Sequence, residues 1–147
     1  NKSIHVTMQG GNSKLANENT EQALVAYLET LQPAVPLAVA RKFESSASVS
    51  RGKELFESRS CHECHQPPTF TSAGKYDVGI HDEYGITEFN PPSLLGISQR
   101  DQFFHDNRAR SLEEVLLKFN HPHTGRLNMP RLSAEESRDL IQYLQTL

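Results

Sequence analysis

The five residues from Cys61 to His65 constrain this chain more than any other part of its sequence. They read Cys61-His62-Glu63-Cys64-His65, a C-x-x-C-H pattern. This pattern is the attachment signature of a c-type haem, because two thiols three positions apart bond to the two vinyl groups of one porphyrin and the adjoining imidazole binds the iron. The sequence therefore predicts one covalently bound haem c with His65 as the first axial ligand.

Two other chemistries use cysteines at this spacing, and both fit the sequence less well. A C-x-x-C redox pair does not require His65, and the surrounding chain lacks the alternation of strands and helices of a thioredoxin-like fold. A closed zinc site usually adds a second Cys or His pair at short spacing. Only His121-Pro122-His123 loosely offers such a pair. Haem attachment is therefore the favoured interpretation.

Composition limits the class of protein and the partners. The chain has 147 residues, 36% of them hydrophobic, with a mean hydropathy of −0.57. This length suffices for one domain with a core, and no apolar run approaches the roughly 20 residues that cross a bilayer. A net charge of −3 implies neither nucleic-acid binding nor a basic membrane face. Because covalent haem attachment is typical of exported chains, we expect a periplasmic or otherwise exported bacterial protein.

The spacing of apolar residues predicts a first helix at about residues 20–31. Its apolar positions are Ala23, Leu24, Tyr27, Leu28 and Leu31. Pro33 and Pro36 end the pattern, and the residues up to 47 read as a linker rich in Pro, Ala and Ser. We therefore divide the chain into an N-terminal extension, residues 1–47, and a monohaem domain, residues 48–147.

A second helix is predicted from Ser48 to about Ser60, and it leads directly into Cys61. Ser48 is the expected N-cap, since a serine hydroxyl accepts a hydrogen bond from a free amide of the first turn. The positions expected to be buried are Val49, Gly52, Leu55 and Phe56.

Two more helices are predicted in the C-terminal part of the chain. Ser111 with Glu114 and Ser133 with Glu136 each match a capping box, in which the serine and the glutamate cap each other's amide. The expected inward positions are Leu112, Val115, Leu116 and Phe119 in the first helix and Leu140, Ile141, Leu144 and Leu147 in the second. Residues 66–110 contain several Gly and Pro and read as loops. Such long loops are reasonable where a macrocycle supplies apolar surface for them to pack against.

The first predicted helix has a counterpart at the C-terminus. Residues 23–31 align without gaps on residues 139–147, with Leu, Tyr, Leu, Thr and Leu in register, and each has a methionine upstream, Met8 and Met129. Two amphipathic helices of similar composition would explain this match. Alternatively, residues 1–31 form the end of a preceding haem domain.

Several segments carry a resemblance to a known family. The helix leading into the haem motif and the last helix, with Gly52 and Phe56 facing Tyr143 and Leu144, resemble the crossing helices of class I cytochromes c. The segments Asn90-Pro-Pro-Ser-Leu-Leu-Gly-Ile97, Phe103-Phe-His-Asp-Asn-Arg-Ala109 and Ser111-Leu-Glu-Glu-Val115 resemble the C-terminal haem domain of bacterial dihaem cytochrome c peroxidases and the related methylamine-utilisation enzyme.

This resemblance, which spans about residues 48–147, implies a mainly α fold. We expect a cytochrome c-like helical domain wrapped around one covalent haem, with long loops. Asn107 stands where family members usually have glycine. Asparagine tolerates the left-handed backbone conformation better than most residues do.

The second axial ligand determines the chemistry of the iron. Met129, in Leu127-Asn-Met-Pro130 ahead of the last helix, occupies the place where class I cytochromes resembling this chain have their axial methionine. Thioether ligation raises the reduction potential and favours electron transfer, whereas an open position admits peroxide. His121 and His123 are alternatives that would give bis-histidine ligation. Methionine as ordinary core filler is the structural alternative.

Arginines are candidate partners of the haem propionates, because a guanidinium forms bidentate contacts with a carboxylate. Arg108 and Arg126 are our candidates, and His105 is a further residue expected to line the haem. A network that only stabilises the loop is the alternative for His105 and Arg108.

The sequence thus favours one-electron transfer through a haem with His65/Met129 ligation, in a module of a larger peroxidase-like protein. The expected partner is a redox protein or an adjacent haem domain. The alternatives are a peroxidase-like catalytic domain with an open or displaceable distal site, or a haem-based sensor.

Overall fold

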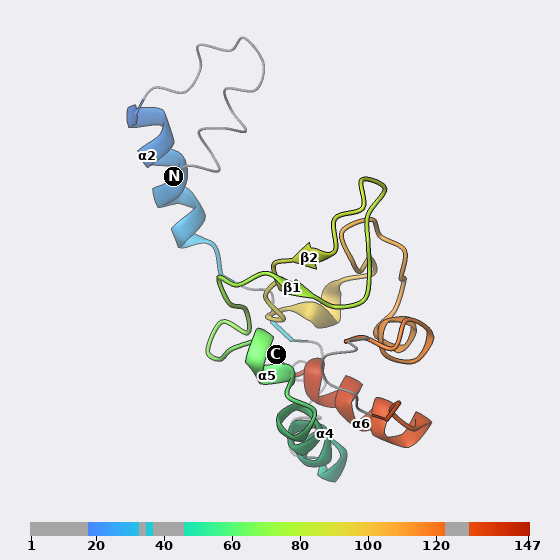
Figure 1. Ribbon diagram of the computed structural model, residues 1–147. Helices are drawn as coiled ribbons and strands as arrows, with labels where there is room; N and C mark the ends of the chain where they lie inside the picture. The colour runs from blue at the N-terminus through green and yellow to red at the C-terminus, as the bar shows by residue number, and fades with distance from the viewer. Residues whose placement is uncertain (1–17, 33–34, 37–45, 123–129) are drawn as a thin grey trace. The chain divides into compact units, whose positions relative to one another are not determined.

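The computed structural model (Figure 1) describes residues 18–32, 35–36, 46–122 and 130–147. The chain divides into two compact units, Asn1–Pro33 and Ala34–Leu147. Among the described residues, no helix has both the length and the apolar character needed to cross a membrane. The elements in chain order are α2 (Glu18–Thr30), α4 (Ala47–Ser58), α5 (Cys61–Cys64), β1 (Tyr76–Asp77), β2 (Glu88–Phe89), the 3-10 turn η1 (Ile97–Gln99), the π-helical segment η2 (Glu114–Lys118) and α6 (Ala134–Leu144).

Helix α2 lies where the apolar spacing predicted a helix, two residues longer at its start. The large apolar side chains at its end are exposed, with Tyr27 at 60%, Leu28 at 46% and Leu31 at 53% of their full accessibility.

Helix α4 begins earlier than predicted, because Ser46 and not Ser48 is its N-cap. Ser46 has extended backbone angles, and its hydroxyl accepts a hydrogen bond from the Val49 amide at 3.2 Å. Ser48 lies inside the helix and donates its hydroxyl to Asp139 of α6. The prediction of Ser48 as the cap was wrong. Ser46 and Ser48 are both suited to capping this helix, and the sequence does not show that Ser48 bonds to a distant residue instead.

Helices α4 and α6 pack against each other (Figure 1). Gly52 lies at this contact, as predicted. A methyl group at Gly52 would collide with the Asp139 carbonyl oxygen and would lie 2.7 Å from the Cβ of Tyr143. Phe56 packs against Tyr143 with ring centroids 5.5 Å apart. Glycine therefore sets the distance between the two helices, since any side chain would push them apart.

Helix α6 has the predicted capping box. Ser133 accepts from the Glu136 amide at 3.1 Å, and the Glu136 carboxylate accepts from the Ser133 amide at 2.7 Å. Leu140 and Leu144 are buried, and Ile141 and Leu147 pack against the core. The buried core consists of Phe56, Leu94, Ile97, Leu112, Leu116, Leu140, Tyr143 and Leu144.

The helix expected over residues 111–119 is wound differently from the prediction. Ser111 caps the Glu114 amide at 3.0 Å, but the Glu114 carboxylate accepts from the amide of Arg110, at 2.7 Å. The capping box is therefore only half formed. From Glu114 to Lys118 the segment is π-helical, with one more residue per hydrogen-bonded turn than an α-helix. Periodicity alone does not reveal such a change.

The stretch between the haem motif and residue 111 is mostly loop, as predicted, with one two-stranded ladder. Strands β1 and β2 pair antiparallel, Tyr76 opposite Phe89. Side chains fasten the flanking loops: Asn90 donates to the Ser72 and Gly74 carbonyls, at 2.7 and 2.9 Å. These bonds satisfy backbone oxygens that no regular element pairs.

Candidate haem site

A large cavity, about 790 Å³, lies inside the unit Ala34–Leu147. Its size is within the range of cofactor and ligand pockets. All side chains of the buried core except Tyr143 line it. The described core is therefore arranged around this space, and apolar side chains form much of the wall.

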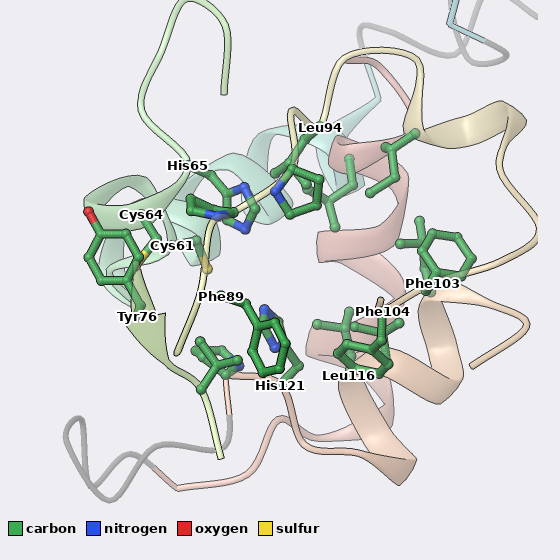
Figure 2. A pocket seen from close by; sticks show the side chains of 18 of the residues that line it. Cys61, Cys64, His65, Tyr76, Phe89, Leu94, Phe103, Phe104, Leu116 and His121 are labelled. Atoms are coloured by element: carbon green, nitrogen blue, oxygen red, sulfur yellow. The ribbon is translucent and has the colours of Figure 1, made fainter. Parts of the chain in front are cut away.

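Both predicted thiols and the predicted proximal histidine line this cavity (Figure 2). They lie on and just after the short helix α5, which follows α4 after two residues. Ser60 supplies the sharp change of direction between these helices, because its backbone is left-handed with φ of 55°. The sequence from Ser60 to His65 thus folds locally so that Cys61, Cys64 and His65 share one side of the cavity.

The ring of His65 has one nitrogen engaged by the backbone. Its Nδ1 donates a hydrogen bond to the Phe70 carbonyl at 3.1 Å. Burial lowers the pKa of His65 below its ordinary value, and the hydrogen bond to the Phe70 carbonyl opposes this shift. A neutral imidazole with Nδ1–H held by a carbonyl leaves Nε2 as the metal-binding atom, which is the usual arrangement of a ligating histidine.

The opposite side of the cavity carries a second imidazole, that of His121 (Figure 2). Burial lowers its pKa to about 4, with a smaller contribution from His65. Its Nδ1 is buried and has no hydrogen-bond partner within the described part of the chain. The His121 ring is therefore neutral near pH 7 and has an unused nitrogen.

Aromatic side chains pack around the site. The ring of Phe104 meets the rings of His121 and Phe119 edge to face, with centroids 5.7 and 5.3 Å apart. His105 also lines the cavity, and its ring stacks on Phe89 at 4.4 Å. Neither Phe89 nor Phe104 was among the predicted site residues, although Phe104 lies in the segment Phe103–Ala109 that carries the family resemblance.

The structure places Arg108 in a loop network and not in the cavity wall. Its guanidinium bonds to Asp106, and it donates to the His81 carbonyl at 2.6 Å. These contacts correspond to the loop-stabilising alternative. Two other arginines, Arg59 and Arg100, line the cavity. No pattern singled them out, although Arg59 stands two residues before the first cysteine.

Asn107 has the left-handed backbone considered for this position, with φ of 59°. Three predicted site residues, Met129, His123 and Arg126, lie outside the described residues. Their assigned roles stay predictions.

The competing chemistries of the two cysteines receive little support from the geometry. Burial raises the pKa of Cys61 to about 11, whereas redox cysteines have lowered thiol pKa values. Across the part of the chain that the structure describes, no group of three or more His, Cys, Asp or Glu could hold a metal ion. The side chains fit a large apolar cofactor with a metal at its centre, held by an imidazole.

A mainly α-helical domain built around such a cavity, with C-x-x-C-H on its wall, defines a cytochrome c-like class of protein. The family model for di-haem cytochrome c peroxidase matches residues 47–146. The chain therefore belongs to the di-haem cytochrome c peroxidase family. No curated protein matches it.

One similar solved structure is the crystal structure of a MauG-like protein associated with microbial copper homeostasis. It shares 21% sequence identity with this chain, with a TM-score of 0.57. The match covers 69% of this chain and 47% of that one, so this chain spans about half of its length. At this identity the likeness supports the fold alone.

Proposed function

We propose that this domain binds one haem c covalently through Cys61 and Cys64, with His65 as an axial ligand, and that it transfers single electrons. Bound there, the haem supplies an iron that changes reversibly by one electron. The observation that carries the proposal is the placement of both thiols and of His65, whose Nε2 is left for the metal, on one wall of an apolar cavity.

The chain's own residues would set the properties of the site. The Phe70 carbonyl holds His65 in one tautomer and orientation. The buried leucines and Phe56 exclude water, which helps to set the reduction potential. Arg100 is the described cationic group on the wall that suits a propionate, because the Arg59 guanidinium is already bonded to Glu136 and to the Pro130 carbonyl.

We further propose that the domain works next to a second redox centre. Membership of a di-haem family and the 47% coverage of the similar structure support an adjacent haem domain, and a separate redox protein is the other candidate. Because haem is attached covalently to exported chains, the proposed location is the bacterial periplasm.

The test is expression of the full chain with export to an oxidising compartment and haem maturation. We expect a mass increase of one haem, a Soret band, and a reversible one-electron titration. Replacing both cysteines, Cys61→Ala with Cys64→Ala, should abolish covalent attachment. The replacement Glu63→Ala, at an exposed position inside the motif, is the matched control and should retain it. Parent protein without haem would contradict the proposal.

A peroxidase-like activity is the second candidate, because His105 lines the cavity and the family is named for peroxidases. That function needs an open or displaceable position on the iron. A high-spin ferric spectrum that shifts on addition of cyanide or peroxide would favour catalysis, whereas a low-spin spectrum unchanged by both would favour electron transfer.

A further inference from the structure

We infer that His121 is the second axial ligand and gives the haem bis-histidine coordination. The inference rests on the proposed function, since it requires haem in the cavity with His65 on one side. Its starting point is that His65 and His121 lie on opposite walls of the cavity, with the Cys61 sulfur between them in the view of Figure 2.

The backbone before His121 is fixed in a way that directs this residue into the cavity. The π-helical segment η2 (Glu114–Lys118) ends just before it, and Asn120 has a left-handed backbone with φ of 50°. The His121 amide donates to the Val115 carbonyl at 3.0 Å. Extra residues in a π-turn are frequent at functional sites, where they redirect a side chain.

The ring of His121 has a nitrogen that the described residues leave unpaired. Nδ1 is shielded from solvent and has no hydrogen-bond partner among the residues that the structure describes, and leaving such an atom unpaired costs free energy. The edge-to-face contact with Phe104 fixes the ring at 5.7 Å between centroids. A buried, oriented and unpaired imidazole nitrogen suits a metal ligand, because metal coordination would satisfy it.

The other described imidazole of the wall fits this role less well. His105 is exposed, and its ring is stacked on Phe89 at 4.4 Å. Met129 is the competing ligand predicted from sequence. The two choices differ in a measurable way, because thioether ligation raises the reduction potential relative to a second imidazole.

The experiment is spectroscopy of the full, haem-loaded chain. We expect a low-spin ferric spectrum without the far-red charge-transfer band of an iron–thioether bond, and electron paramagnetic resonance signals of bis-histidine haem. His121→Met should introduce the thioether band and raise the reduction potential. His121→Ala should give a high-spin form that binds cyanide and returns to low spin with added imidazole. Met129→Leu should leave the parent spectrum unchanged.

Each contrary result has a distinct meaning. A thioether band in the parent that Met129→Leu abolishes would assign the position to Met129 and overturn the inference. A high-spin parent spectrum, or a low-spin one lost only in His123→Ala, would overturn it as well. All three leave the proposed haem site intact. Absence of haem from the parent would instead remove the proposed function. The parent spectrum alone separates bis-histidine from thioether ligation, and the spectra of His121→Met and His121→Ala, compared with that of His123→Ala, identify which histidine binds the iron.

Discussion

Glycine at position 52 is the residue on which the packing of α4 against α6 depends most directly. A Cβ at position 52 would meet the Asp139 carbonyl and the Cβ of Tyr143. Both lie on the backbone of α6 or one bond from it. Neither is the end of a flexible side chain. Relief would therefore require a shift of the whole helix, and α4 also carries Phe56 of the core and leads into the haem motif.

Gly52→Ala should lower the free energy of unfolding by about 1–3 kcal/mol, the usual cost of overpacking a core. The helix propensity of alanine acts in the opposite direction by roughly 1 kcal/mol. Urea unfolding of the haem-loaded protein measures the difference. Lys53→Ala, at an exposed neighbouring position of the same helix, is the matched control and should change stability by about 0.5 kcal/mol or less. A Gly52→Ala variant more stable than the parent would show that the helices do not approach so closely.

At the scale of elements, the sequence predicted the helices at both ends of the haem domain well. Their apolar spacing and capping residues are local signals, so the capping box of Ser133 and the Gly52 crossing were both found. The π-helical winding after residue 113 was missed, because its hydrogen-bond pattern depends on packing and not on residue spacing. Ser48 was misassigned for a related reason, since its partner Asp139 is distant in sequence.

Charged groups also fasten α4 to α6. Asp139 receives a hydrogen bond from Arg51 at 2.6 Å and another from Ser48. The Arg51 guanidinium, followed by the Ser48 hydroxyl, holds the pKa of Asp139 below its ordinary value. A carboxylate with a lowered pKa in the folded protein contributes stability that is complete above its unfolded pKa, about 4, and is lost as pH falls through the folded value.

Asp139→Asn should therefore be less stable than the parent near neutral pH, and the difference should stay constant down to about pH 5 and shrink as pH falls below about 4. Urea midpoints of both proteins across this range measure it, with helical circular dichroism as the signal. Glu113→Gln replaces an exposed carboxylate outside this network and is the control. The difference in stability between this variant and the parent should change little with pH. A difference between parent and Asp139→Asn that stays constant with pH would contradict the assigned role of the Arg51–Asp139 pair.

At the scale of the whole haem domain, the sequence predicted the side of the cavity that carries Cys61, Cys64 and His65. It did not predict most of the residues that line the opposite side. Cys61, Cys64 and His65 lie within five residues of one another, so their spacing alone predicted that they belong to one site. Of the distant side chains considered, His121 and His105 line the cavity, whereas Arg108 bonds within a loop network, because long-range folding of loops decides which distant side chains reach the cavity. Phe89 and Phe104 come from such loops, and residue type alone does not show that an aromatic side chain in a loop reaches the cavity.

All the buried core residues except Tyr143 also line the cavity, so the domain should depend on its cofactor for cooperative folding. Without haem, Phe56 and the leucines around it would face about 790 Å³ of space instead of packed atoms, and unfilled apolar space destabilises a core.

A chain with both Cys61→Ala and Cys64→Ala, purified without haem, tests this dependence. It should retain much of its helical circular dichroism signal but lose a sharp unfolding transition and bind a hydrophobic dye, as loosely packed states do. Limited proteolysis should cut it within residues 66–110 much faster than the haem-loaded parent, because those loops line the cavity wall. Equal urea midpoints and equal proteolysis of the two proteins would mean that the helices hold the domain together without the cofactor.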